Sequence, residues 1–382
     1  MKNLVILGSS GSIGINTLNV VRRFPKEFKV IALTAFNNLT LLEKQIEEFS
    51  PQYVAVGRLG IDDLKRRLNG RKTKVLDVDL DVSRIVGLPE VDIVVIGMRG
   101  SAALIPFLSA VRAGKTVAPA NKEALVIAGD LLLQEAKKYH ARIIPIDSEQ
   151  SAIFQCLEGR NRSDLKRIYL TASGGPLHNV ARPRFGRLTV QQILRHPRWK
   201  MGKKITVDSA SLMNKGFEVI EAQRLFGLEV DDIEVVIHPE AVVHSMVEFT
   251  DGCVLAQLGI ADMRLPIQYA LTYPARLESG LKPLDFFRMG PLNFSRPDVK
   301  KFPALNLCFH VARKGGSLPC VLNAADEEAV DAFLNGRLGF SKIYKVVEKV
   351  VLKHRIIKMP GLDELFEADR WARAEAQSAI KT

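Results

Sequence analysis

A glycine-rich turn near the first residue limits the folds that this chain can adopt. Residues 4–7 are apolar and predict a buried strand, which leads into Gly-Ser-Ser-Gly-Ser-Ile-Gly at residues 8–14 and a helix-like pattern through residue 23. This arrangement forms an anion site, because free backbone N–H groups and the helix dipole face the turn. The spacing is GxxGxxG, an imperfect match to the common GxGxxG. Its place after the first strand, with a second strand at 29–33, predicts a doubly wound dinucleotide-binding domain. The alternative is a tight turn without a ligand.

The loop after the second strand bears on the choice of dinucleotide. An acidic residue at this place would hydrogen-bond the free ribose 2′-hydroxyl of NAD. Residues 34–38 are Thr-Ala-Phe-Asn-Asn and include no acid. The loop therefore argues against NAD as the cofactor, but it does not establish NADP as the cofactor.

The alternation of strands and helices continues along the chain. Strands are expected at 53–56, 91–96 and 115–119, and helices at 61–68 and 101–113. Asn121, Lys122 and Glu123 follow the last of these strands, and ligands of open parallel sheets lie beyond the carboxyl ends of the strands. We therefore expect these side chains to contact a cofactor or substrate. The alternative is a plain helix start, with Asn121 as N-cap and Glu123 in the first turn.

Two carboxylates follow the apolar run at residues 143–146. Residues i and i+2 of an extended chain point to the same side, so Asp147 and Glu149 can face one point. Converging carboxylate oxygens suit a divalent cation such as Mg²⁺ or Mn²⁺. The alternative is a solvated strand end, with Ser148 or Ser151 capping the next helix.

Two later segments carry residue types suited to binding. A strand expected at 166–171 ends in Ala-Ser-Gly-Gly-Pro, where Ser173 and the glycine N–H groups can bind an anion; a plain turn is the alternative. A helix is expected around residues 190–194, and the segment from His196 to Gly202 follows it. Trp199 lies there among Pro, Gly and charged residues, which indicates either a lid over a pocket or a structural clamp.

Residues 205–221 combine phosphate-binding and metal-binding side chains. The pattern predicts a short strand, a polar turn and a helix. Ser209, Asn214 and Lys215 are donors suited to a phosphate. Glu218 is the natural third carboxylate for the metal pair. Acidic residues in the first turns of a helix would also occur for capping reasons alone.

The C-terminal part carries no chemistry that we can identify. Residues 275–297 are rich in Pro, Gly and aromatics and predict a long connection. From residue 303 to about 379, four helical patterns predict a small bundle that braces the catalytic part. His238 and His244 match no zinc spacing and are expected in the core or a pocket wall.

Charge and cysteine content narrow the class of protein. The net charge of +12 comes from 54 basic and 42 acidic residues. The basic residues are dispersed, which argues against nucleic-acid binding and favours an anionic substrate. Four cysteines without a CxxC pair are expected as buried free thiols in a reducing compartment. The early glycines exclude a secretory signal, and no apolar run is long enough to cross a membrane, so we expect a cytoplasmic protein.

Together these motifs resemble those of the 1-deoxy-D-xylulose 5-phosphate reductoisomerase family. They occur in the family's order across about residues 1–275, and the C-terminal helices also fit. The motifs lie at residues 8–14, 121–123, 147–149, 173–176, 196–202, 208–218 and 244–246. The resemblance implies an NADPH-dependent enzyme of non-mevalonate isoprenoid biosynthesis. It would rearrange 1-deoxy-D-xylulose 5-phosphate and reduce the resulting aldehyde to 2-C-methyl-D-erythritol 4-phosphate.

The resemblance also implies roles for individual residues, a Mg²⁺ or Mn²⁺ ion and a homodimer, with no nucleic acid or membrane as partner. The implied metal ligands are Asp147, Glu149 and Glu218, and the implied catalytic residues are Lys122, Glu149 and His196. Substrate contacts are implied for Ser148, Glu149, Ser173, His196, Trp199, Met201, Ser209, Asn214, Lys215 and Glu218, with Trp199 and Met201 in a lid. Cofactor contacts are implied for Gly8, Ser9, Ser10, Gly11, Ser12, Ile13, Gly14, Asn38, Asn121, Lys122, Glu123, Gly202 and Met263.

The expected fold class is α/β, in four parts. A Rossmann-like parallel-sheet NADPH domain spans 1–146, an α+β catalytic and dimerisation domain 147–275, a linker 276–302 and a helical domain 303–382. The chain departs from the family at residues 36–38, where Phe-Asn-Asn stands in place of the frequent Gly-Lys-Asn.

Two alternative functions remain. One is a metal-independent semialdehyde-type dehydrogenase, which leaves the three carboxylates unexplained. The other is a non-enzymatic nucleotide-sensing or nucleic-acid-binding protein.

Overall fold

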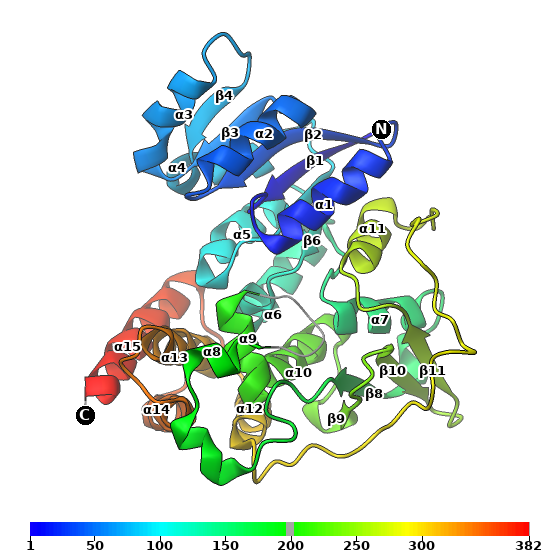
Figure 1. Ribbon diagram of the computed structural model, residues 1–382, viewed down its shortest axis with the longest axis vertical. Helices are drawn as coiled ribbons and strands as arrows, with labels where there is room; N and C mark the ends of the chain where they lie inside the picture. The colour runs from blue at the N-terminus through cyan, green and yellow to red at the C-terminus, as the bar shows by residue number, and fades with distance from the viewer. Residues whose placement is uncertain (196–201, 382) are drawn as a thin grey trace. The chain divides into compact units, whose positions relative to one another are not determined.

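The computed structural model describes residues 1–195 and 202–381, and the chain divides into two compact units (Figure 1). Unit 1 comprises Met1–Ala124, Leu132–Ser151 and Asp262–Leu281. Unit 2 comprises Leu125–Leu131, Ala152–Ala261 and Lys282–Thr382. The division into four domains given above stays a prediction.

Unit 1 is built on a seven-stranded parallel sheet with the order β4-β3-β2-β1-β5-β6-β7. Its strands are β1 (Lys2–Leu7), β2 (Phe28–Ala35), β3 (Tyr53–Val56), β4 (Lys74–Asp77), β5 (Ile93–Ile96), β6 (Thr116–Pro119) and β7 (Arg142–Ile143). Its helices are α1 (Ser12–Arg23), α2 (Leu39–Phe49), α3 (Ile61–Arg67), α4 (Val78–Val86), α5 (Leu104–Arg112) and α11 (Arg264–Thr272). The helices α6 (Lys122–Lys138) and α7 (Ser148–Leu157) contribute residues to both units.

The strand order confirms the predicted doubly wound fold. The chain runs outward from β1 through β2 to β4 and then crosses to β5 on the other side of β1. Leu4, Val5, Ile6 and Leu7 are all fully buried, as expected for a central strand covered by helices on both faces. The switch of direction between β1 and β5 is where such sheets bind their ligands. The strand β4 and the helices α2 and α4 were not predicted from the sequence.

The prediction that Asp147 and Glu149 share one side of an extended chain is wrong. The chain is extended only to Ile146, whose N–H donates to the carbonyl of Pro119 at 2.9 Å. The helix α7 begins at Ser148, so Glu149 stands in its first turn. The alternation rule for strands therefore does not relate the two carboxylates, whereas a negative charge in a first helical turn is favoured by the helix dipole.

Unit 2 contains a four-stranded mixed sheet and a group of helices. The sheet has the order β11-β10-β8-β9, in which β8 (Leu165–Ala172) is parallel to β9 (Ile233–Ile237) and antiparallel to β10 (Val243–Phe249), which pairs with β11 (Val254–Leu258). The helices are α8 (Val190–Ile193), α9 (Lys203–Ser211), α10 (Met213–Phe226), α12 (Pro303–Lys314), α13 (Leu318–Leu334), α14 (Phe340–Lys353) and α15 (Leu362–Lys381). The last four confirm the predicted C-terminal helices.

The short strand predicted at the start of residues 205–221 is wrong, because these residues belong to the helix α9. Ile205, Thr206 and Val207 are β-branched and favour a strand when considered locally. In the structure Thr206, Val207 and Ala210 are buried at helical spacing, and the Thr206 hydroxyl donates to the carbonyl of Gly202 at 2.8 Å. Tertiary burial thus overrides the local propensity.

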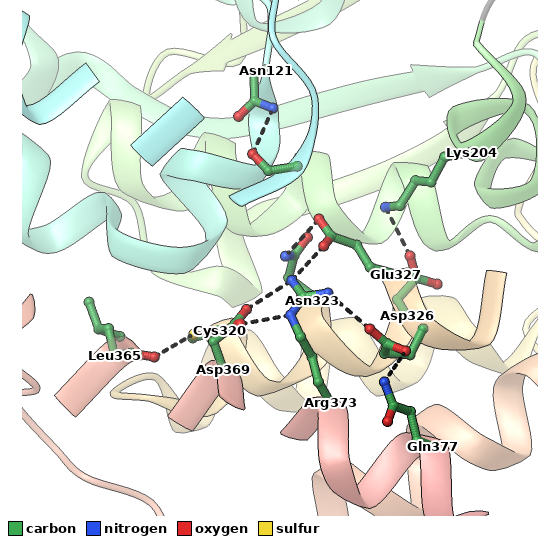
Figure 2. A network of polar contacts seen from close by, with 12 residues as sticks. Asn121, Lys204, Cys320, Asn323, Asp326, Glu327, Leu365, Asp369, Arg373 and Gln377 are labelled. Carbon is green, nitrogen blue, oxygen red and sulfur yellow. Dashed lines mark hydrogen bonds and ion pairs between the residues drawn. The ribbon is translucent and has the colours of Figure 1, made fainter. Parts of the chain in front are cut away.

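A polar network ties the helix α13 to α15 in the C-terminal bundle (Figure 2). The guanidinium of Arg373 on α15 forms ion pairs with Glu327 and Glu328 on α13 at 2.6 and 3.3 Å, and with Asp369 on its own helix at 2.7 Å. These pairs raise the pKa of Arg373, although its partial burial acts in the opposite direction. The network joins two helices of the bundle, and the bracing role predicted for the bundle stays a prediction.

The long connection after α11 is attached to the sheet of unit 2 by a buried histidine. The ring Nε2 of His238 accepts the N–H groups of Val242 and Val243, both at 3.2 Å, and Nδ1 lies 2.9 Å from the carbonyl oxygen of Asn293. Nδ1 also lies 3.0 Å from a carboxylate oxygen of Glu240. Phe294 stacks on the same ring. The expected core role of His238 is confirmed.

The four cysteines are unpaired, and three of them are buried. Burial raises the pKa of Cys156 to about 11 and that of Cys320 to about 12, and it also raises the pKa of Cys308. Cys253 is exposed in the turn between β10 and β11, so the prediction of four buried thiols is wrong for this residue. No described helix is long and apolar enough to cross a membrane.

Candidate active site

The glycine-rich turn of unit 1 is held by hydrogen bonds from two neighbouring elements. The N–H of Gly8 donates to the Thr34 hydroxyl at 2.8 Å, and the Ser9 hydroxyl donates to the Gln45 side chain at 2.7 Å. Gln45 in turn donates to the carbonyl of Ser9 at 2.9 Å. Gly8 has a φ of +80°, and a Cβ there would lie 2.8 Å from the Gly97 carbonyl oxygen. Only glycine fits both requirements.

The turn leaves the first N–H groups of α1 open to a ligand. Gly11 is the N-cap and has no side chain to bond them. Gly14 packs directly on the turn, and a Cβ there would collide with the Cα of Ser9 and the carbonyl oxygen of Gly8. A compact turn below an uncapped helix start is the cradle that a dinucleotide pyrophosphate needs. The residues present therefore fit the cofactor that the sequence implies.

We expect Gly14→Ala to abolish detectable NADPH binding. The added methyl would collide with the backbone of Ser9 and Gly8, which must move and open the turn. Titration with NADPH, followed by the quenching of protein fluorescence, measures the effect. Gly339→Ala is the matched control, because a Cβ at Gly339 meets no atom within 4 Å. Full NADPH affinity in Gly14→Ala would contradict the role given to the turn.

Other predicted cofactor residues of unit 1 begin helices. The Asn38 side chain accepts from the N–H of Leu41 at 3.2 Å and caps α2. Asn121 caps α6 by accepting from Ala124 at 2.9 Å, while its amide group donates to the carbonyl groups of Met98 and Gly100 at 3.0 and 3.2 Å. Capping, the alternative interpretation of Asn121, is therefore confirmed. Glu123 stands in the first turn of α6, and Met263 precedes α11.

A buried ion pair joins two predicted site residues of unit 1. The ammonium group of Lys122 lies 2.6 Å from a carboxylate oxygen of Asp147. The next residue, Ser148, donates its hydroxyl to Glu149 at 2.6 Å. Lys122 opens α6 and Asp147 precedes α7, so the pair connects two helix starts beyond the carboxyl ends of β6 and β7. Burying a charged side chain away from water is costly unless it has a partner of opposite charge, and each of these two side chains provides that partner for the other.

In unit 2, the turn after β8 packs on the helix α9. Gly174 and Gly175 have φ values of +83° and +67°. A Cβ on Gly175 would collide with the Ser209 carbonyl oxygen, so glycine is required for this close approach. The contact brings the Ser173 turn next to Ser209.

Glu218 has both of its oxygens engaged by the preceding turn of α10. Its carboxylate accepts from Asn214 at 2.6 Å and forms an ion pair with Lys215. Only 1% of the Glu218 residue surface is exposed. Leu212, with a φ of +61°, separates α9 from α10 and directs this first turn. A carboxylate held in place in this way is a suitable ligand for a hard cation.

A second buried charge cluster in unit 2 was missed by the sequence analysis. Lys204 on α9 lies 2.7 Å from Asp208 on the same helix. It also lies 2.9 Å from Asp326 on α13 (Figure 2). Its ammonium group also stands 4.5 Å from the centre of the Phe217 ring, next to Glu218 in sequence. The only sequence signal was the i,i+4 spacing of Lys204 and Asp208.

Of the remaining predicted site residues, one is described by the structure and three are not. Gly202 is described and is the N-cap of α9. His196, Trp199 and Met201 lie outside the described residues, so their predicted roles in catalysis and the lid stay predictions.

A turn that opens a helix start to a pyrophosphate, on a doubly wound parallel sheet, places this chain among the dinucleotide-dependent oxidoreductases. Three family models match consecutive parts of it. One described as 1-deoxy-D-xylulose 5-phosphate reductoisomerase matches residues 4–129, and two described as C-terminal domains of the same enzyme match residues 143–226 and 258–375. The chain belongs to the 1-deoxy-D-xylulose 5-phosphate reductoisomerase family.

Relatives of the same description match over their full length. The protein of Thermodesulfovibrio yellowstonii is 47% identical over 381 residues, with 100% of both chains covered. That of Pelotomaculum thermopropionicum is 49% identical over 383 residues, with 100% of this chain and 99% of the relative covered. A solved reductoisomerase in complex with NADPH, fosmidomycin and magnesium is 38% identical, with a TM-score of 0.95, and the match covers 100% of this chain and 98% of that chain. The enzyme from Zymomonas mobilis in complex with NADPH is 37% identical, with a TM-score of 0.93, over 100% and 99% of the two chains.

Proposed function

We propose that this chain converts 1-deoxy-D-xylulose 5-phosphate into 2-C-methyl-D-erythritol 4-phosphate, using NADPH and a divalent metal ion. The observation that carries the proposal is the end-to-end match to relatives of that name. Solved structures of the family contain NADPH and magnesium, and their fold is that of this chain. The match disfavours both alternatives, a metal-independent dehydrogenase and a non-enzymatic protein.

Asp147, Glu149 and Glu218 are proposed to hold the metal ion together. Hard carboxylate oxygens suit Mg²⁺ or Mn²⁺, and each of the three side chains offers such an oxygen. When bound, the ion would supply a Lewis acid for oxygen atoms of the substrate. Lys122 and Lys215 balance the negative charge of the donor set, because they pair with Asp147 and Glu218.

The phosphate of the substrate is assigned to the hydroxyl, amide and ammonium groups of unit 2. Ser173, Ser209, Asn214 and Lys215 supply the donors, and the packing of the Ser173 turn on α9 supports a joint role. Binding energy from a phosphate remote from the reacting carbons can be used to orient the substrate. Ser148 and Lys122 are proposed to contact the hydroxyl groups of the substrate, and His196, Trp199 and Met201 to complete the site.

NADPH is proposed to place its pyrophosphate on the turn at residues 8–14 and its nicotinamide toward the substrate. NADPH would supply the hydride for reduction of the aldehyde. Asn38, Asn121, Glu123, Gly202 and Met263 are proposed to line the cofactor. Support comes from the ends of β1, β2 and β6, which carry most of these residues at the edge of the sheet where dinucleotides bind.

We further propose a cytoplasmic homodimer. Four unpaired thiols suit a reducing compartment. The strand β11 is an edge of the four-stranded sheet and pairs with β10 alone among the described strands, which leaves its other side available to a second copy. Light scattering of the purified protein tests the dimer.

The reaction itself is tested by following the absorbance of NADPH with 1-deoxy-D-xylulose 5-phosphate. We expect oxidation with Mn²⁺ or Mg²⁺ and its loss on adding EDTA, because the carboxylates would lose their ion. Excess metal should then restore the rate. Oxidation that persists in EDTA would favour the metal-independent dehydrogenase.

A further inference from the structure

The ends of the strands β2 and β3 form one rim of the sheet in unit 1. The strands are parallel, with Ala35 opposite Val56. One further hydrogen bond, from the N–H of Gly57 to the carbonyl of Phe36 at 3.3 Å, extends the pairing beyond both strands. Arg58 follows Gly57 directly and starts a short 3-10 helix at this rim. A residue outside the predicted ribose loop thus reaches that loop from the neighbouring strand.

Arg58 is a cation at this rim that has no partner among the described residues. Residues 34–38 contain neither an acid nor a Lys or Arg. Arg58 is exposed and forms no ion pair or hydrogen bond within residues 1–195 and 202–381. Three acidic side chains of the helices α2 and α3 are paired with other arginines. Glu43 and Asp63 pair with Arg67 at 3.5 and 2.8 Å, and Glu47 pairs with Arg71 at 2.8 Å.

An aromatic surface lies next to this cation. Phe36 is 62% exposed, although it is a large apolar side chain at a strand end. Its ring covers Gly57, where an added Cβ would stand 3.4 Å from a ring carbon. Asn38 holds α2 through its side-chain oxygen. An exposed ring beside an unpaired guanidinium matches a phosphorylated adenosine, because the ring can stack on a base and the guanidinium can bind a phosphate with two hydrogen bonds.

We propose that Arg58 binds the 2′-phosphate of NADPH and sets the preference for NADPH over NADH, with Phe36 beside it as the surface for the adenosine. This inference rests on the proposed use of NADPH. It assigns the discrimination to the end of β3, since the loop after β2 offers no charged group of either sign.

The test compares Arg58→Gln with Lys65→Gln, which removes an exposed cation from the adjacent helix α3. In Arg58→Gln we expect KM for NADPH to rise about 10- to 100-fold, the range that loss of one charge-assisted contact gives. KM for NADH and kcat should stay within about twofold, because NADH has no phosphate there. Lys65→Gln should leave all three values unchanged. An equal rise of KM for NADH, an unchanged KM for NADPH, or the same rise in Lys65→Gln would overturn the proposal.

A binding measurement separates this inference from the proposed reaction. Calorimetric titration with 2′,5′-ADP and with 5′-AMP needs no turnover. We expect the wild-type protein to prefer 2′,5′-ADP and Arg58→Gln to lose that preference. A wild-type protein that prefers 2′,5′-ADP but does not turn over the substrate would retain the Arg58 assignment and reject the reaction. Equal binding of both nucleotides by the wild-type protein would reject the assignment.

Discussion

Replacing Glu218 by Gln is expected to lower kcat about a thousandfold and to leave the affinity for NADPH unchanged. A Lewis acid contributes several kcal/mol to such a reaction, and each 1.4 kcal/mol is a factor of about ten in rate. The amide removes the negative charge that a hard cation prefers and leaves Lys215 without its buried ion pair. Steady-state kinetics over a range of Mn²⁺ concentrations, together with NADPH titration, measures both quantities.

Glu221→Gln is the matched control for this experiment. Glu221 lies on the same helix, one turn farther along, and is also only 1% exposed. It is not among the proposed ligands, so its replacement should leave the dependence of the rate on Mn²⁺ intact even if the protein becomes less stable. Equal loss of NADPH affinity in Glu218→Gln, or an equal loss of metal dependence in both variants, would count against the proposed metal site.

Replacing Lys204 by Met is expected to lower the free energy of unfolding by about 3–5 kcal/mol, the cost of breaking a buried ion pair. The side chains of Asp208 and Asp326 are 2% and 1% exposed, and Lys204 pairs with both. Without its ammonium group, two carboxylates would remain close together in the interior of unit 2. Thermal unfolding followed by circular dichroism measures the loss.

Two further variants separate the charge effect from a general loss of packing. Lys203→Met changes the exposed neighbour and should have almost no effect on stability. Adding Asp326→Asn to Lys204→Met removes one of the two uncompensated charges and should restore part of the lost stability. If Lys204→Met and Lys203→Met unfold at the same temperature, the cluster contributes nothing measurable.

The parts of the fold predicted correctly from the sequence are those with a strong local signal. The glycine turn determines where β1 ends, and α1 spans the predicted residues because its apolar face has a clear helical period. Likewise, Tyr53–Val56 is a strand with the predicted bounds. The error at residues 205–207 arose because β-branched residues favour a strand locally, whereas the burial of Thr206 and Val207 favours a helix.

The residues of the candidate site were predicted from their chemical type, whereas the predicted backbone geometry around them was partly wrong. Asp147 and Glu149 were identified as metal ligands from an argument about strands that does not apply, since Glu149 lies on a helix. The bond from Gln45 to the glycine turn and the pair of Lys204 with Asp326 join residues far apart in the chain. No local pattern encodes such pairs, because they form only when separate elements pack.

The distribution of the four thiols makes the unmodified protein suitable for selective labelling. Cys156, Cys308 and Cys320 are buried with raised pKa values, so few of these thiols are ionised near neutral pH. Cys253 is exposed in the β10–β11 turn, beside the edge strand proposed to meet a second copy. A maleimide fluorophore should therefore attach at this one position, and its polarisation would report self-association directly on the natural chain.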